Sequence, residues 1–458
     1  MIENDAFKLL LINLFHLNPD DIANILCTTF NKMMVLVVTL TDKHQACPYC
    51  GFTAPKIKEY VTKEITHSAL TTQKCIIKYR ARRYKCSCCG KTYYEFNPFV
   101  FKSQKISILT VHNILKDLKD FNETFTSVAR RYHVSPTSVS TIFDKHVDIG
   151  RNPLPEIINF DEVYAFKSEK SKYVCVILDF KKQIPVDVLP NRKKEYLLNY
   201  FQKIPLEERK KVKYACSDMY EVYRDVVHKV FPSCCMLLDY FHLSQDFHRK
   251  MNEVRIKVMK GYKDNKASDE YYLLKKFNWL LFKNPEDEDK YGRLFDVERE
   301  RKYNSHFKSY MNYYDLRKKL LEINNDLTIC YSLKLELVDF YSKSTIDNAK
   351  VNLENLIRSC IDTNIDEMIA FSNNLINWKQ EIINSFTIVG TEYKVEADKG
   401  QVVVCNKKVN NAIIENRNKI VKCIKNNANG YTNWSRFRNR VMYVLDPNAT
   451  FSLEPREK

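Results

Sequence analysis

The sequence has little of what marks disordered or fibrous chains. Glycine and proline account for only 8 and 14 of the 458 residues, whereas 45% of residues are hydrophobic and 28% are charged. These fractions are typical of folded proteins, and no internal repeat or low-complexity linker is evident. The composition therefore excludes a largely disordered chain, and the length predicts roughly two to four domains.

Long apolar runs are also missing. The longest candidate is Met33 to Leu40, much shorter than the run of about 18 residues that a membrane-spanning helix needs. The first residues, Met-Ile-Glu-Asn-Asp, are acidic where a signal peptide would be basic. We expect no membrane partner and a cytoplasmic, intracellular protein. Most of the 15 cysteines lie singly in apolar runs, as Cys175 and Cys216 do, which predicts reduced core residues.

Positive charge and aromatic residues are abundant. The chain has 73 Lys and Arg against 56 Asp and Glu, a net charge of +17, together with 28 Tyr and 26 Phe. Between Lys74 and Lys105 nine basic residues stand against one acid, Glu95. This pattern favours nucleic-acid binding, with Arg82 and Arg83 as candidate contacts. The alternative is a basic surface without such a role.

Two cysteine pairs have the spacing of zinc knuckles. Cys47-Pro-Tyr-Cys50 and Cys86-Ser-Cys88-Cys89 are each followed by glycine. Four thiolates suit tetrahedral zinc, so Cys47, Cys50, Cys86 and Cys89 predict a structural Zn²⁺ site in a small ribbon. Incidental cysteines are the alternative, and Cys88 or His44 could replace one ligand.

Residues 105–147 have a helical pattern that contains a helix, a short turn and a second helix begun by Ser135 and Pro136. A helix-turn-helix fits this order. It would lay residues 136–145 in a DNA major groove. The predicted contacts are Thr137, Ser138 and Thr141 on the bases, and Arg130 and Arg131 on phosphates. An ordinary helical hairpin with a buried apolar face is the alternative.

From residue 156 to 239 the pattern changes to a mixed α/β order. Strands are predicted at residues 157–166, 173–180, 184–189, 212–217 and 234–238. Helices are predicted at 193–204 and 219–230, and a further helix is predicted after residue 238. The order is therefore three strands, then helix, strand, helix, strand and helix. Residues 250 to about 385 are charged and predict an all-helical insertion. A hairpin at 391–405, turning at Asp398-Lys399-Gly400, and a basic helix at 410–424 are predicted after it.

This pass along the chain predicts a multidomain α/β protein. The expected units are an N-terminal segment at 1–40, a zinc ribbon at 41–103, a helix-turn-helix at 104–150, a mixed-sheet domain at 151–250 plus 390–458, and the insertion at 251–389.

Three acidic residues are candidates for metal chemistry. Asp161 interrupts an apolar strand, where a buried carboxylate is costly unless it is paired or bound to metal. Asp218 ends a strand, although it could instead cap the next helix. Glu415 is the only acid between Lys399 and Leu445, although it could simply pair with Lys419. Together they could offer two divalent cations hard oxygen ligands within a basic frame.

Ordered motifs along nearly the whole chain resemble the ISL-three insertion-sequence family, a branch of the DDE transposases. They are Cys-Pro-x-Cys-Gly at 47–51, Arg-Arg-Tyr-x-Cys-x-x-Cys-Gly at 82–90, Asp161-Glu162, Ser217-Asp218-Met-Tyr, Leu238-Asp239-Tyr-Phe-His242, Ile414-Glu415-Asn-x-Asn-Lys-Ile and Gly430-Tyr-x-Asn-Trp-x-Arg-Phe-Arg438-x-Arg440.

The resemblance implies an RNase H-like catalytic core interrupted by the helical insertion. It implies that Asp161, Asp218 and Glu415 are the catalytic triad, with Glu162, Asp239 and His242 beside them. The implied cofactors are two Mg²⁺ or Mn²⁺ ions, besides the structural zinc. Further DNA contacts are expected at Arg417, Lys419, Lys422 and Arg438.

On this resemblance the function is transposition in a bacterial, nucleoid-associated setting. The enzyme would bind the terminal inverted repeats, cut the phosphodiester at the element's end, and join the freed 3′-hydroxyl to target DNA. A homodimer on double-stranded DNA is expected. Two alternatives are a catalytically inactive or domesticated DNA-binding regulator and another RNase H-like nuclease.

Overall fold

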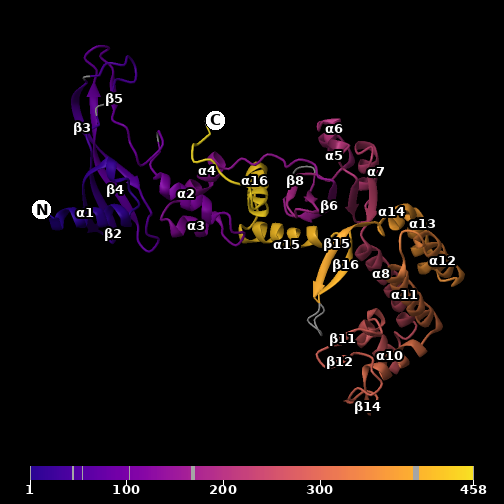
Figure 1. The fold of residues 1–458 in the computed structure, drawn as a ribbon. Coiled ribbons are helices and arrows are strands. Elements are labelled where there is room, and N and C mark those ends of the chain that lie inside the picture. The colour runs from indigo at the N-terminus through magenta and orange to yellow at the C-terminus, as the bar shows by residue number, and fades with distance from the viewer. Residues whose placement is uncertain are drawn as a thin grey trace.

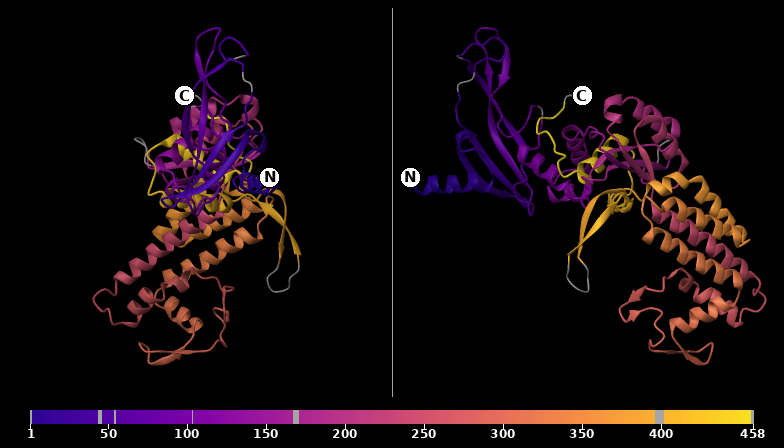
Figure 2. Two further views of the ribbon diagram at one scale, coloured as in Figure 1. Left: turned by 90° about the vertical axis from the view of Figure 1, so that its left-hand side faces the viewer. Right: turned by 45° about the vertical axis from the view of Figure 1, so that its right-hand side comes forward.

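The computed structural model describes residues 2–43, 46–53, 55–102, 104–166, 171–395 and 402–456. The elements follow one another along an elongated molecule, with an N-terminal sheet at one end and a helical region at the other (Figures 1 and 2). A second sheet lies between them. Within the described residues no helix is sufficiently long and apolar to cross a membrane.

The N-terminal region is a helix packed on a five-stranded sheet. Helix α1 (Ile2–Leu14) and a 3-10 turn, η1 (Pro19–Asp21), precede the strands. These are β1 (Ile22–Phe30), β2 (Met33–Leu40), β3 (Lys56–Thr66), β4 (Cys75–Lys85) and β5 (Thr92–Tyr94). The order is β1-β2-β4-β3, with β5 also beside β4, and β2 runs parallel to β4. Strands of the segments 1–40 and 41–103 therefore pair within one sheet.

Three short helices follow: α2 (Ile108–Asp117), α3 (Phe125–Arg131) and α4 (Pro136–His146). Each begins at a hydroxyl cap, because the side chains of Ser107, Thr124 and Ser135 accept hydrogen bonds from backbone N–H groups of the first turn. Val128 and Val139 are fully buried in the core between the helices. The helix, turn and helix expected from the sequence are thus present.

The second sheet has the order β10-β9-β6-β7-β8. Its strands are β6 (Ile157–Tyr164), β7 (Tyr173–Asp179), β8 (Pro185–Leu189), β9 (Tyr214–Ser217) and β10 (Cys235–Leu238). The first three are antiparallel, while β9 and β10 run parallel to β6. This matches the strand series expected from the sequence.

Helices cover both faces of this sheet. One face packs against α5 (Lys194–Gln202) and α7 (Glu221–Val230), with the short α6 (Leu206–Arg209) between them in sequence. The other face packs against α15 (Ala412–Asn427) and α16 (Trp434–Leu445). The C-terminal helices thus return to the sheet after the insertion (Figure 1).

The insertion is mainly helical and has its own core. It contains α8 (Tyr240–Lys260), α9 (Asp269–Lys276), η2 (Asn278–Phe282), α10 (Tyr313–Glu322), α11 (Asn325–Lys343), α12 (Ala349–Asp362), α13 (Asp366–Asn377) and α14 (Lys379–Asn384).

The prediction of an all-helical insertion is wrong in one respect. Two short hairpins are present, β11 (Glu288–Asp289) with β12 (Gly292–Arg293), and β13 (Lys302–Asn304) with β14 (Ser309–Met311). Strands this short show no apolar alternation in a charged segment, so periodicity does not reveal them. A longer hairpin, β15 (Ile388–Val395) and β16 (Val402–Lys408), follows the insertion. Its predicted turn at Asp398 to Gly400 lies outside the described residues.

Candidate active site and nucleic-acid interface

Strand β6 presents two adjacent carboxylates to opposite faces of the second sheet, because side chains alternate along a strand. Asp161 accepts a hydrogen bond from Asn418 Nδ2 of α15 at 2.7 Å. Glu162 accepts one from the Tyr223 hydroxyl of α7 at 3.3 Å. Asp218 follows the neighbouring strand β9. Ligand oxygens of Asp161, Glu162 and Asp218 all lie within 4.8 Å of one another.

Two of these carboxyl groups have strongly shifted acidity. Burial raises the pKa of Asp161 to about 7, helped by the negative charges of Asp218 and Glu162. Burial, helped by Glu162, also raises the pKa of Asp218 to about 7, against the opposing effect of Arg192. Asp218 Oδ1 is buried and has no hydrogen-bond partner among the described residues. The protein's own hydrogen bonds and charges therefore compensate the carboxylate forms of this pair only in part.

A second group of ligand atoms lies where β10 ends. Asp239 follows β10, His242 is in the first turn of α8, and Glu415 is in the first turn of α15. His242 Nε2 is 3.9 Å from Asp239 Oδ2 and 3.8 Å from Glu415 Oε1. This nitrogen is buried and has no hydrogen-bond partner in the described chain. Burial raises the pKa of Asp239, while His242 lowers it.

The two groups are electrostatic neighbours. The charge of Asp239 contributes to the raised pKa of Asp218, and His242 lowers the pKa of Asp161. Asp161 and Asp218 thus belong to one ligand group, and Glu415 belongs to the adjacent one with Asp239 and His242. Glu415 lies on the same edge of the sheet as the two aspartates, but the three predicted acids do not share a single set of close ligand atoms.

The donor chemistry fits divalent cations. Mg²⁺ and Mn²⁺ prefer carboxylate oxygens, and each group offers at least two carboxylates. Asp218 Oδ1, which is buried and has no hydrogen-bond partner in the described part of the chain, is an oxygen that such a cation could bind.

Asparagines that the sequence analysis missed hold α15 against β6. Asn159 donates to Asn411 Oδ1 at 2.7 Å and to the Asn410 carbonyl at 2.8 Å, while Asn418 contacts Asp161. Asn418 could have been noticed, since it lies three residues after Glu415 and so near the same helical face. These bonds set the position of the helix that carries Glu415.

Arg192 is a second residue that the sequence analysis missed. It forms an ion pair with Glu162, and its guanidinium lies 4.5 Å from the ring centre of Tyr173 and 4.8 Å from that of Tyr220. Its ion pair with Glu162 places this cation beside the group formed by Asp161, Glu162 and Asp218. Arg192 lies between β8 and α5, outside both elements, so no strand or helix periodicity in the sequence marks it.

The four predicted zinc ligands come together. Ligand sulfurs of Cys47, Cys50, Cys86 and Cys89 lie within 4.8 Å of one another, with Cys47 3.8 Å from Cys89 and Cys50 3.5 Å from Cys86. Each pair turns on a glycine with positive φ, 74° at Gly51 and 69° at Gly90, a conformation that disfavours other residues. Cys88 is exposed and outside the group, and His44 lies outside the described residues.

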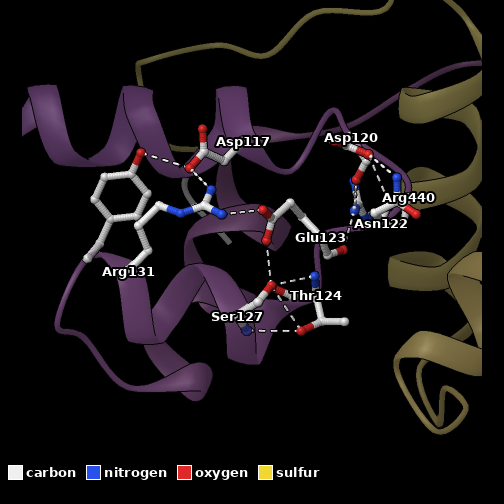
Figure 3. A network of polar contacts seen from close by, with 9 residues as sticks. Asp117, Asp120, Asn122, Glu123, Thr124, Ser127, Arg131 and Arg440 are labelled. Carbon is white, nitrogen blue, oxygen red and sulfur yellow. Dashed lines mark hydrogen bonds and ion pairs between the residues drawn. The ribbon is translucent and has the colours of Figure 1, made fainter. Parts of the chain in front are cut away.

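Of the helix-turn-helix residues predicted to contact DNA, some are exposed, whereas others are bonded to neighbouring side chains of the protein. Thr137 and Thr141 are exposed on α4, and Arg130 is exposed on α3. Ser138 is half-buried, and its hydroxyl is 2.8 Å from that of Ser135. Arg131 is bound by the carboxylates of Asp117 and Glu123 (Figure 3).

Other predicted basic contacts are also engaged within the protein. Arg82 pairs with Glu95 at 2.7 Å, and Arg83 with Glu59 at 2.6 Å. Arg438 pairs with Asp187 at 2.6 Å.

On α15 the predicted contacts differ in their exposure. Lys419 and Lys422 are exposed. Arg417 is half-buried and donates to the Gln183 carbonyl at 3.1 Å. Of the contacts predicted on this helix, Lys419 and Lys422 are therefore the most accessible.

Helix α16 fastens the helix-turn-helix to the second sheet. Arg440 is 1% exposed and donates to the carbonyls of Asp120 at 2.9 Å and Glu123 at 2.7 Å (Figure 3). Arg436 pairs with Asp144 of α4 at 2.6 Å. The same helix packs on the sheet through Phe437 and neighbouring apolar residues. The predicted recognition helix and the carboxylate cluster are therefore held in one framework.

Comparison with known proteins places this framework in a family. The family model for DDE transposases of the ISL-three type, described as "Transposase", matches residues 158–402, more than half of the chain. The transposase for insertion sequence element IS1001 of Bordetella parapertussis is 19% identical over 411 residues, which cover 89% of this chain and 91% of that protein. The matched region includes both aspartates of the Asp161 group. The chain therefore belongs to the ISL-three family of insertion-sequence transposases, enzymes that cut DNA.

Proposed function

We propose that Asp161, Asp218 and Glu415 are the catalytic carboxylates with which this transposase cuts the ends of its element and joins them to target DNA. The observation that carries the proposal is the half-buried pair Asp161 and Asp218, whose ligand oxygens lie within 4.8 Å of each other and of Glu162. Glu415 lies in the adjacent group, on a helix bonded directly to Asp161 through Asn418.

The strand order supports an RNase H-like assignment of this sheet. Three antiparallel strands are followed in the chain by two strands parallel to the first. Asp161 lies on the first strand and Asp218 ends the fourth, so both carboxylates reach one edge. Active sites of open α/β sheets form at such edges.

Asp161, Asp218 and Glu415 would hold two Mg²⁺ or Mn²⁺ ions, with Asp239 and His242 beside Glu415. When bound, the ions would polarise the phosphodiester and favour deprotonation of the attacking hydroxyl. Asn418 keeps Asp161 oriented, and Arg192 does the same for Glu162. Lys419 and Lys422, exposed on the helix of Glu415, are placed to contact phosphates.

DNA recognition is assigned to α4, whose exposed Thr137 and Thr141 would reach base edges in a major groove, with Arg130 on phosphates. The terminal inverted repeats would be the recognised sequence, and two ends would be brought together by a homodimer. Cys47, Cys50, Cys86 and Cys89 would hold a structural zinc ion. The presence of all three acids disfavours an inactive regulator.

The test is cleavage of a linear duplex that carries the element's own end. With Mg²⁺ the wild-type protein should nick at the end, and Asp218→Asn should bind the duplex but fail to cut. Glu207→Gln, an exposed acid on α6, is the matched control and should cut normally. Cleavage by Asp218→Asn at the wild-type rate would overturn the proposal.

A further inference from the structure

A groove on the N-terminal sheet has no role assigned so far. It measures about 1000 Å³ and lies between β3, β4 and the described residues of the segments 94–102 and 104–105. Its lining includes four lysines, Lys63, Lys74, Lys102 and Lys105, and aromatic rings, among them Tyr94 and Phe96. Lys74, Lys102 and Lys105 are exposed, and Lys63 is half-buried.

The groove has an excess of positive charge. Its two acids are already neutralised, because Glu64 pairs with Lys78 at 2.7 Å and Glu95 pairs with Arg82 at 2.7 Å. By contrast, none of the four lysines forms an ion pair with a carboxylate in the described part of the chain. An anionic ligand would therefore meet uncompensated ammonium groups along the groove.

Aromatic rings lie beside these charges. Tyr94 is 42% exposed and Phe96 is 68% exposed. The Lys63 ammonium lies 4.0 Å from the centre of the Tyr94 ring. Exposed rings next to ammonium groups suit a polymer that alternates phosphates with flat or apolar sugar and base surfaces.

The groove is fixed to the helix-turn-helix. Thr66 N donates to the Lys105 carbonyl, and Ser107 N donates to the Thr66 carbonyl, both at 2.9 Å. Ser107 in turn caps α2. Ser68 adds a hydrogen bond from its hydroxyl to the Tyr132 carbonyl at 2.7 Å. A DNA duplex bound to α4 would therefore find a second basic surface of the protein, the groove, at a fixed position relative to α4.

We propose that this groove binds the sugar-phosphate backbone of the same DNA duplex that the helix-turn-helix recognises, beyond the segment that α4 covers. The inference rests on the proposed DNA recognition by α4. It assigns the phosphate contacts of the N-terminal sheet to Lys63, Lys74, Lys102 and Lys105. Arg82 and Arg83, the contacts expected from the sequence, are instead occupied by Glu95 and Glu59.

The test is a salt titration of DNA binding by the full-length protein, using fluorescence anisotropy and a labelled duplex bearing the element's end. Lys63→Gln/Lys102→Gln should bind more weakly and lower the slope of log K against log salt concentration by about 2, because each lost phosphate contact lowers it by about 1. The control variant Lys203→Gln/Lys229→Gln removes the same charge and should leave the slope unchanged. Both lysines are exposed and lie on the side of the second sheet that α5 and α7 cover.

The outcomes separate this inference from the proposed function. If wild-type protein binds and both double variants have the wild-type slope, the groove does not bind DNA. If Thr137→Ala/Thr141→Ala loses sequence discrimination while keeping the slope, recognition by α4 stands whatever the groove variants do. Should the Lys63 variant fail to fold in a thermal melt, Lys102→Gln/Lys105→Gln, both exposed, serves in its place with the same expected change in slope.

Discussion

Asn418 donates a hydrogen bond from Nδ2 to Oδ2 of Asp161 at 2.7 Å. It lies three residues after Glu415 on α15, so the two side chains are close on the helix surface. The bond therefore fixes both the orientation of one carboxylate and the rotation of the helix that carries another. Residues 257 positions apart are joined in this way at the sheet edge.

Asn418→Ala should reduce DNA cleavage much more than stability. Losing one hydrogen bond costs about 1 kcal/mol of folding free energy. The effect on cleavage should be larger, because Asn418 no longer holds Asp161 in a fixed position relative to the helix that carries Glu415. Single-turnover cleavage and urea unfolding measure the two quantities. Asn426→Ala, exposed on the same helix, is the control, and equal cleavage by the two variants would contradict the expectation.

The free energy of unfolding of metal-free protein should depend on pH through Asp161 and Asp218. Their pKa values rise from 3.8 to about 7 in the folded state. The folded state therefore holds protons that the unfolded chain releases, and stability falls as pH rises from about 4 to about 7. Urea unfolding in EDTA across this range measures the effect. Asp161→Asn/Asp218→Asn should flatten this dependence, and an unchanged slope would show that the two groups titrate normally.

Zinc content should follow the cysteine group. Cys86→Ser removes a ligand from a tetrahedral set, so purified protein should lose its zinc and the N-terminal sheet should become sensitive to proteolysis. Cys88→Ser changes an exposed thiol outside the group and should retain about one zinc per chain. Metal analysis and limited proteolysis are the measurements. Zinc retained by Cys86→Ser but lost by Cys88→Ser would reverse the ligand assignment.

Arg440→Met should destabilise the contact between α16 and the helix-turn-helix. It removes the hydrogen bonds that the buried guanidinium donates to the carbonyls of Asp120 and Glu123, at a cost of about 1–3 kcal/mol. Arg293→Met, on a side chain 64% exposed, should have little effect. Urea unfolding compares the two variants. Equal stability would mean that Arg440 does not fasten the two units.

Strong local patterns allowed much of the fold to be predicted. The apolar strands at β6 to β10 and the Ser135-Pro136 start of α4 are signals contained within a few residues. The cysteine pairs are similar, because knuckle spacing and the following glycine are local features. Asp161 was noticeable as a charge within an apolar strand.

What could not be predicted depends on partners distant in the sequence. Nothing in the sequence distinguishes Arg82, Arg131 and Arg438 from basic residues that are free to bind DNA. In the structure each forms an ion pair with a carboxylate distant in the sequence. The grouping of Glu415 with Asp239 and His242 likewise arises only when α15 packs beside α8. Parallel pairing of β2 with β4 also needs the tertiary fold, since parallel strands are never joined by a tight turn.

The role of Glu415 as a catalytic carboxylate is tested most directly by Glu415→Gln, assayed for binding and for cutting of the same end-bearing duplex in Mg²⁺ and in Mn²⁺. The variant keeps the size of the side chain and should bind DNA with wild-type affinity while producing no cleaved end with either ion. Normal cleavage by Glu415→Gln would contradict the assignment of the triad.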